Sequence, residues 1–259
     1  MPKLAANLTL LFNEFDFLER FRLAAEAGFK GVECQFPYAY DPRVLKRKLA
    51  DHGLVQVLHN LPAGDWGKGD RGIACLPDRV AEFEAGVEQA IRYARQLGCR
   101  NLNCLAGIPP LDLDLKDARM TLVRNLRYAA QRLKAAGIAL LIEPLNTRDV
   151  PGFFLSRSAQ ALDVICDVGV DNLFLQYDVY HMQVMEGDLA RTIERSAAHI
   201  AHIQIADSPG RHEPGTGEID YTFLLPFLDR IGYAGWVGCE YSPAAGTTAG
   251  LDWARTYLA

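Results

Sequence analysis

Short apolar runs alternate with longer segments of helical periodicity along the whole chain. The run at 138–142 has five consecutive apolar residues and ends at Glu143, which is typical of a strand buried on both faces. Residues 16–27 instead carry apolar side chains at helical spacing and stop at Gly28. This alternation predicts strands over 4–11, 31–36, 54–59, 101–106, 138–143, 172–178, 200–206 and 236–240, and helices over 16–27, 42–51, 78–97, 115–136, 156–168, 188–198, 221–231 and 248–257.

These eight strand-helix units follow one another without a linker or a break in composition. Strict alternation implies parallel strands joined by crossover helices, and eight such units in about 250 residues fit a closed (β/α)₈ barrel. We therefore predict an α/β fold with a single TIM barrel domain over residues 1–259. An open doubly wound sheet is the alternative, although no Gly-x-Gly-x-x-Gly follows any strand to suggest dinucleotide binding.

The composition argues against a nucleic-acid or membrane partner. The chain has 49% hydrophobic and 23% charged residues, ordinary values for a globular protein, and a formal charge of −5 that argues against a nucleic-acid-binding surface. No apolar run reaches the ~18 residues of a membrane span, and the N-terminus lacks the pattern of a signal peptide. The six cysteines form no Cys-x-x-Cys pair and are predicted to be reduced, as in a cytoplasmic protein. A homo-oligomer is compatible with the sequence.

The last polar residue of each of the last four predicted strands has a side-chain oxygen. In a TIM barrel, the carboxyl ends of the strands meet at one rim, where active sites lie. An ionised carboxylate at the end of an apolar strand costs several kcal/mol in desolvation unless it is paired or binds a cation. A single such residue is more often a helix cap, but four in succession favour a shared metal. We predict that one Mg²⁺ or Mn²⁺ is bound by Glu143, Asp178, Gln204 and Glu240.

Several segments resemble the hydroxypyruvate isomerase family of xylose-isomerase-like TIM barrels. They are Ile-Glu-Pro-Leu-Asn (142–146), Gln-Tyr-Asp-Val-Tyr-His (176–181), His-Ile-Gln-Ile-Ala-Asp (202–207), Glu-Pro-Gly-Thr-Gly-Glu-Ile (213–219), Gly-Cys-Glu-Tyr (238–241) and His-Asn-Leu-Pro-Ala-Gly-Asp-Trp (59–66). The resemblance covers essentially the whole chain. It implies the same four metal ligands and the interconversion of hydroxypyruvate with tartronate semialdehyde.

Such an isomerisation removes a proton from one carbon and returns it to the next. We hypothesise that Glu143 and Glu240 act as general base and general acid, in addition to binding the metal, because a nearby cation stabilises the enediolate charge. His181 is predicted to contact a substrate oxygen, and Arg211 to bind the substrate carboxylate through its planar fork. His59 is a weaker candidate for the pocket, because a buried core histidine explains it equally well.

Related activities remain as alternatives. The 2-oxo-tetronate isomerases share the metal residues, although segments 59–66 and 142–146 are nearer to the hydroxypyruvate branch. A ketose 3-epimerase would use the same chemistry on a longer sugar, but those enzymes commonly have His where Gln204 stands. An abasic-site endonuclease needs several zinc ions and many histidine ligands, and the chain has only six histidines. A non-catalytic sugar-acid binding protein would not need two glutamates to flank the substrate.

Overall fold

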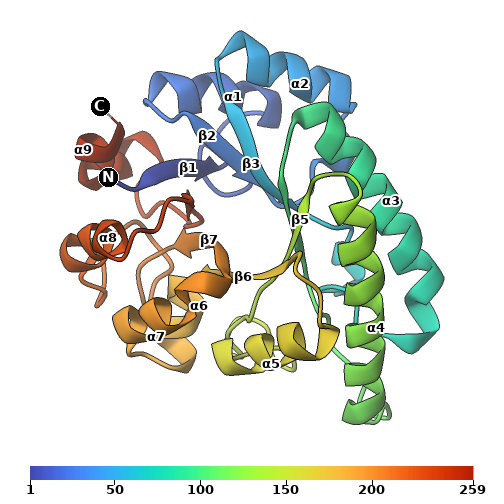
Figure 1. Cartoon of the computed structure of the whole chain (residues 1–259). Helices are drawn as coiled ribbons and strands as arrows, with labels where there is room; N and C mark the ends of the chain where they lie inside the picture. Colours follow the sequence, from blue (N-terminus) through green and yellow to red (C-terminus); the bar gives the residue numbers. More distant parts are fainter. Residues whose placement is uncertain (259) are drawn as a thin grey trace.

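Eight parallel strands close into a barrel in chain order, β1 to β8, with β8 pairing with β1. The computed structural model describes residues 1–258 and confirms the predicted fold class (Figure 1). The strands are β1 (Lys3–Asn7), β2 (Gly31–Cys34), β3 (Val55–Asn60), β4 (Asn101–Cys104), β5 (Ala139–Ile142), β6 (Leu173–Asp178), β7 (Ile200–Ile205) and β8 (Trp236–Cys239).

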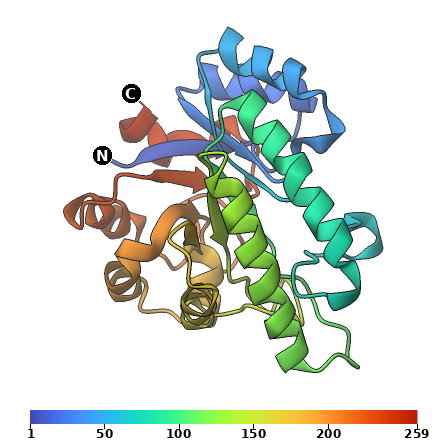
Figure 2. The same cartoon turned by 45° about the vertical axis from the view of Figure 1, so that its right-hand side comes forward.

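Helices surround the barrel, and Figure 2 shows α3 and α4 running side by side along one flank. They are α1 (Phe17–Glu26), α2 (Pro42–Asp51), α3 (Val80–Leu97), α4 (Leu115–Lys134), α5 (Ser158–Val168), α6 (Val179–Met185), α7 (Leu189–Ser196), α8 (Tyr221–Arg230) and α9 (Arg255–Leu258). Five short 3₁₀ helices lie between them within residues 1–258: Pro37–Ala39, Trp66–Lys68, Pro77–Arg79, Ala197–His199 and Thr248–Ala254. Helix α9 lies beside β1 in both views.

Apart from shifts of one or two residues at element ends, the structure differs from the predicted elements in three places. Strand β1 ends at Asn7 instead of residue 11, because the Asn7 carbonyl accepts hydrogen bonds from the amides of Leu10 and Leu11 and turns the chain. Helix α6, directly after β6, was not predicted. The predicted helix 248–257 is mostly 3₁₀, and only its last turn is α-helical.

The hydrophobic core has two parts. A large cluster fills the layer between the strands and the helices, and a small one, Ala5, Val57, Leu58 and Leu141, fills part of the barrel interior. Other interior positions carry buried polar side chains, among them Glu33, His202 and Gln204. The barrel interior is therefore polar where the carboxyl ends of its strands approach the rim.

The cysteines agree with the expectation from sequence: all six are free, and only Cys166 is exposed. Among residues 1–258, no helix combines the length and apolar character needed to cross a bilayer.

Candidate active site

Three carboxylates and one imidazole meet at the carboxyl ends of β5, β6 and β8. Glu143, Asp178, His181 and Glu240 each offer a ligand atom, and these atoms lie within 4.8 Å of one another. None of the four residues is more than 5% exposed. The structure thus brings together three of the four predicted metal ligands, with His181 beside them. Such a group could hold a metal ion.

Asp178 shows why a carboxylate is stable at this position. It is the N-cap of α6, and its Oδ1 accepts hydrogen bonds from the backbone amides of Tyr180 (2.8 Å) and His181 (3.2 Å). Its Oδ2 is buried and has no hydrogen-bond partner. A buried carboxylate oxygen without a partner carries a large desolvation cost, which a cation would offset. The donor set of the site therefore fits a divalent metal.

The two glutamates have strongly perturbed acidities. Burial, followed by the charges of Glu240 and Asp178, raises the pKa of Glu143 well above its usual range. Burial raises the pKa of Glu240 to about 7, although Arg211 opposes the shift. Carboxylates packed this closely cannot all be ionised without added positive charge. Burial and mutual repulsion therefore favour the binding of a proton or a cation at this site.

The hydrogen bonds of His181 define its tautomer. The Asn146 side-chain oxygen accepts from the amides of Arg148 and Asp149, so its Nδ2 is the atom that faces His181 Nδ1, at 2.7 Å. The Asn146 backbone amide also donates to Nδ1, at 3.1 Å. Nδ1 therefore accepts, and Nε2 carries the hydrogen.

The charge state of His181 follows from its surroundings. Burial, and to a lesser extent Arg211, lowers the pKa of His181 to about 4, so the ring is neutral at pH 7. Its Nε2 lies 3.7 Å from Asp178 Oδ2, beyond a normal hydrogen bond. A neutral Nε2–H is a donor without lone pairs to offer a metal. This arrangement disfavours metal ligation by His181, and its predicted contact with a substrate oxygen stays a prediction.

Gln204 lies next to the carboxylates on the strand ladder, because Asp178 and Gln204 are register partners between β6 and β7. Its Nε2 donates to Glu33 Oε1 at 2.7 Å, and its Oε1 accepts from Gln176 Nε2 at 2.6 Å. The Gln204 oxygen retains a second lone pair. Its assignment as a metal ligand stays a prediction.

The loop after β7 is organised around the buried carboxylate of Asp207. That carboxylate accepts hydrogen bonds from four backbone amides, those of Ser208, Gly215, Gly217 and Ile219, at 2.9–3.1 Å. A side chain at Gly217 would lie 2.0 Å from the carbonyl oxygen of Ser208. The segment 213–219 is thus explained as the part of the loop that wraps this carboxylate.

Arg211 is carried into the site by the same loop. Its Nη2 donates to Glu240 Oε2 at 2.8 Å, and its guanidinium lies over the ring of Tyr180, 5.3 Å from the centroid. Its Nε is buried and without a hydrogen-bond partner. The structure places the Arg211 guanidinium beside Glu240. Its role in binding the substrate carboxylate stays a prediction, supported by the unused Nε–H donor.

His59 requires a correction. The neighbouring Asn60 accepts a hydrogen bond from Asn103 on the inner face of the barrel, and successive strand residues point to opposite faces. His59 accordingly faces the helical layer, where its ring meets Tyr38 edge-on at 6.0 Å. It is fully buried there, and burial lowers its pKa to about 3. The structure does not support the prediction that His59 binds substrate.

Sequence reasoning missed several amides that hold the carboxylates. Asn103 Nδ2 donates to Glu143 Oε2 at 2.8 Å, and Glu240 Oε1 accepts from Asn7 (3.0 Å) and Gln35 (3.2 Å). Neither Asn7 nor Asn103 was assigned a contact with the carboxylates from the sequence. The available signal was an amide inside a predicted strand, which is costly to bury without a partner.

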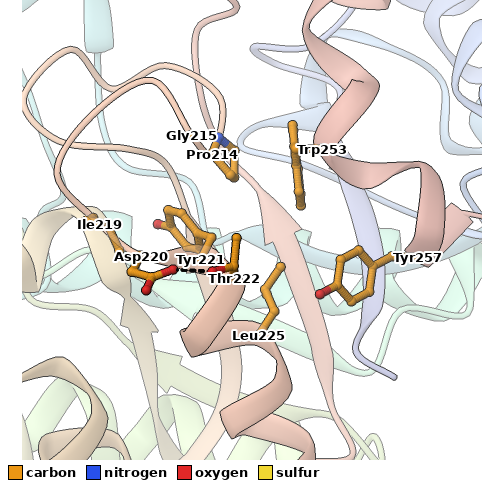
Figure 3. A pocket seen from close by; sticks show the side chains of 9 residues that line it. All are labelled: Pro214, Gly215, Ile219, Asp220, Tyr221, Thr222, Leu225, Trp253 and Tyr257. Carbon is orange, nitrogen blue, oxygen red and sulfur yellow. Dashed lines mark hydrogen bonds between the residues drawn. The ribbon is translucent and has the colours of Figure 1, made fainter.

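A separate pocket of about 230 Å³ lies outside this site, between the start of α8 and the C-terminal segment (Figure 3). Tyr221, Trp253 and Tyr257 contribute aromatic rings to its wall. None of the buried carboxylates lines it. This pocket is therefore separate from the carboxylate group at the barrel rim.

Comparison with known proteins agrees with this arrangement. Residues 21–257 match the family model described as xylose isomerase-like TIM barrel, and the chain belongs to that family. A crystal structure described as an AP endonuclease, family 2, from Brucella melitensis superimposes with a TM-score of 0.97, at 49% identity and with 99% of both chains covered.

Two curated relatives define the class of enzyme more closely. The chain is 54% identical to hydroxypyruvate isomerase of Escherichia coli (strain K12), over 99% of this chain and 100% of the relative. It is 46% identical to 2-oxo-tetronate isomerase of Cupriavidus necator, over 100% of this chain and 99% of the relative. The protein is accordingly an enzyme of the isomerase class.

Proposed function

We propose that this isomerase interconverts hydroxypyruvate and tartronate semialdehyde and that it requires one divalent cation, Mg²⁺ or Mn²⁺. The observation that carries the proposal is the buried group at the barrel rim, in which three carboxylates lie within 4.8 Å of one another. The choice of substrate is supported by the relative that is 54% identical over the full chain. The substrate is then a small 2-oxo hydroxy acid.

Glu143, Asp178, Gln204 and Glu240 are the residues that would hold the cation. All four offer oxygen, the donor that Mg²⁺ and Mn²⁺ prefer. The unpartnered Asp178 Oδ2 and the raised pKa values of the two glutamates are the features that a cation would relieve. When bound, the cation supplies electrostatic stabilisation for the negative charge that develops on the substrate oxygens.

Glu143 and Glu240 would move the proton. An efficient general acid or base has a pKa near the operating pH, and the pKa of Glu240 is raised to about 7. Glu143 takes its raised pKa from burial and from the neighbouring carboxylates. The two glutamates come from β5 and β8, so a small acid bound at the rim would lie between groups from different strands. One removes the proton from carbon, and the other returns a proton to the adjacent carbon.

His181 and Arg211 would hold the substrate. The Nε2–H of His181 is a neutral donor fixed by Asn146, and it would bind a substrate oxygen. Arg211 offers an unpartnered Nε–H and lies against Tyr180, which limits the movement of the guanidinium. Arg211 Nη2 donates a hydrogen bond to Glu240 Oε2. A substrate carboxylate would use the remaining donors of the fork.

The proposal is tested by measuring kcat/KM for hydroxypyruvate, a 2-oxo-tetronate and a free ketohexose, each with protein stripped by EDTA and with Mg²⁺ or Mn²⁺ restored. We expect the highest kcat/KM for hydroxypyruvate, its loss after stripping and its return with metal. Undiminished turnover by the stripped protein would contradict metal dependence. A higher kcat/KM for the ketohexose would contradict the substrate class.

A 2-oxo-tetronate isomerase is the second candidate, because relatives of that name are 41–46% identical over nearly the whole chain. The same assay separates the two. A kcat/KM at least tenfold higher for the four-carbon acid would assign the protein to that activity without changing the roles of the site residues.

A further inference from the structure

A fourth carboxylate, Glu33 on β2, lies in the barrel interior and has no part in the mechanism above. It is completely buried. Its Oε1 accepts hydrogen bonds from Asn7 Nδ2 at 2.9 Å and from Gln204 Nε2 at 2.7 Å. Its Oε2 lies 2.7 Å from His202 Nε2. Every one of these contacts is with another buried side chain of the barrel interior.

Strand β8, which is separated from β2 by β1 alone, leaves room for this carboxylate. A Cβ at Gly238 on β8 would lie 2.5 Å from both carboxylate oxygens of Glu33, so a larger residue at 238 would clash with it. Burying a carboxylate costs several kcal/mol unless hydrogen bonds compensate, whereas an apolar residue would fill the same space without that cost. A role in packing alone therefore gives a poor account of Glu33.

One hydrogen-bond partner of Glu33 is a proposed metal ligand, and another also binds a proposed metal ligand. The Nδ2 of Asn7 that donates to Glu33 also donates to Glu240 Oε1, at 3.0 Å. Gln204 is itself a proposed ligand and the register partner of Asp178. Glu33 thus lies behind two of the four proposed ligands, one through Asn7 and one by direct contact.

Both amides have a defined orientation because of these contacts. Asn7 Oδ1 accepts from the Thr9 backbone amide, so its Nδ2 must face the carboxylates. If the Gln204 amide were turned by 180°, its oxygen would face a carboxylate oxygen of Glu33 and its amino group would face that of Gln176. Both new contacts would be repulsive. Glu33 therefore turns the Gln204 oxygen away from itself.

We propose that Glu33 is a positioning residue that orients the Gln204 oxygen toward the cation and holds Glu240 through Asn7. This inference rests on the proposed metal site. It assigns Glu33 no contact with substrate and no proton transfer. Residues that orient metal ligands typically change metal affinity by 10- to 100-fold when they are mutated.

The first test is Mn²⁺ binding to metal-stripped Glu33→Gln, measured by titration of free Mn²⁺ with electron paramagnetic resonance. We expect Kd to rise about 10- to 100-fold while the variant still unfolds cooperatively. The matched control is Gln56→Met. Gln56 is also buried in the barrel wall, but its amide donates to the Leu58 carbonyl and the Cys34 sulfur and not to the site. Its Kd should remain within about twofold of wild type.

A second test exchanges the two side chains. The double variant Glu33→Gln with Gln204→Glu keeps the number of charges and restores a hydrogen bond in the reverse direction. The Kd changes of the two single variants, multiplied together, give the Kd expected if the residues act independently. We expect the double variant to bind Mn²⁺ at least tenfold more tightly than that, because residues in direct contact are coupled in double-mutant cycles. If Glu33→Gln alone does not fold, an exchanged pair with a Kd within about tenfold of wild type supports the proposal.

Three results would overturn it. One is a Kd within twofold of wild type in folded Glu33→Gln. Another is a double variant whose change in Kd equals the product of the two single changes in Kd. If Glu33→Gln fails to fold, the corresponding result is a double variant that binds Mn²⁺ more than tenfold more weakly than wild type. A wild-type protein that binds no Mn²⁺ would contradict the metal site itself and this proposal with it, whereas tight wild-type binding with either of the other results would contradict only the role of Glu33.

Discussion

The two halves of the barrel supply different groups to the same rim. Strands β5 to β8 provide the carboxylates that meet within 4.8 Å of one another, together with Gln204. Strands β1 to β4 provide Asn7, Asn103 and Glu33, which form hydrogen bonds to those groups. The second half therefore carries the groups that would bind metal and move protons, and the first half carries groups that hold them. This division predicts mutational effects of different size and kind.

The largest effects should follow changes to the proton-moving carboxylates of the second half. Glu143→Gln and Glu240→Gln keep an oxygen ligand but cannot exchange the proton. We expect each to lower kcat about 10²- to 10⁴-fold, the usual contribution of a general acid or base. Steady-state assays with saturating Mn²⁺ would measure this. Activity within tenfold of wild type in both variants would contradict the assignment.

A smaller effect should follow a change to a holding group of the first half. Asn103→Ala removes the donor to Glu143 Oε2, and we expect kcat/KM to fall about 10- to 100-fold. The matched control is Asn125→Ala in α4, whose amide donates to the Ala74 carbonyl outside the barrel. That variant should lose stability but retain kcat/KM within about twofold. Equal losses of kcat/KM in both variants would remove the distinction between the two halves.

The crowding of carboxylates in the second half should appear in the pH dependence of stability. Glu240 has a pKa of about 7 in the folded protein, raised from 4.5 first by burial, so the folded state binds its proton more tightly than the unfolded state. Stability must then fall as pH rises from about 4.5 through 7. We expect Tm of the metal-stripped protein to drop by roughly 5–10 °C between pH 5.5 and 8.

Scanning fluorimetry across this pH range measures the effect, and Glu240→Gln should flatten the dependence. Added Mn²⁺ should raise Tm most at pH 8, where protons compete least for the carboxylates. A Tm of the stripped wild-type protein that rises with pH would contradict the account.

The smallest effect is expected at His59. His59 packs in the helical layer, with its ring edge-on to Tyr38 and beside the Ala90 backbone, so His59→Met should lower Tm by no more than a few degrees. Its kcat/KM should stay within about twofold of wild type. His181→Leu is the comparison, because it removes a donor in the site and should lower kcat/KM at least tenfold. If kcat/KM fell as much in the His59 variant as in the His181 variant, His59 would have to be counted among the site residues.

The same division explains how much the sequence could predict. The sequence predicted the eight strand-helix units and the carboxylates at strand ends. An apolar strand that ends in Glu143 or Glu240 needs a partner or a cation to stabilise the buried carboxylate. The sequence did not predict whether the His59 side chain points into the barrel or toward the helices, because this depends on the register of a strand whose alternation is weak. Arg211 was predicted from the sequence as a site residue, but its contact with Glu240 depends on a loop folded around Asp207. The amides of the first half act at long range in the sequence: Asn7 reaches Glu240, 233 residues away.

One cation is proposed to bind among the carboxylates of the second half. The most direct measurement is calorimetric titration of Mn²⁺ into the metal-stripped protein and into Asp178→Asn, since Asp178 Oδ2 is the buried oxygen without a partner. We predict one Mn²⁺ per chain for the wild type and an affinity at least 100-fold lower for the variant. No binding by the wild type, or equal binding by both proteins, would contradict the account.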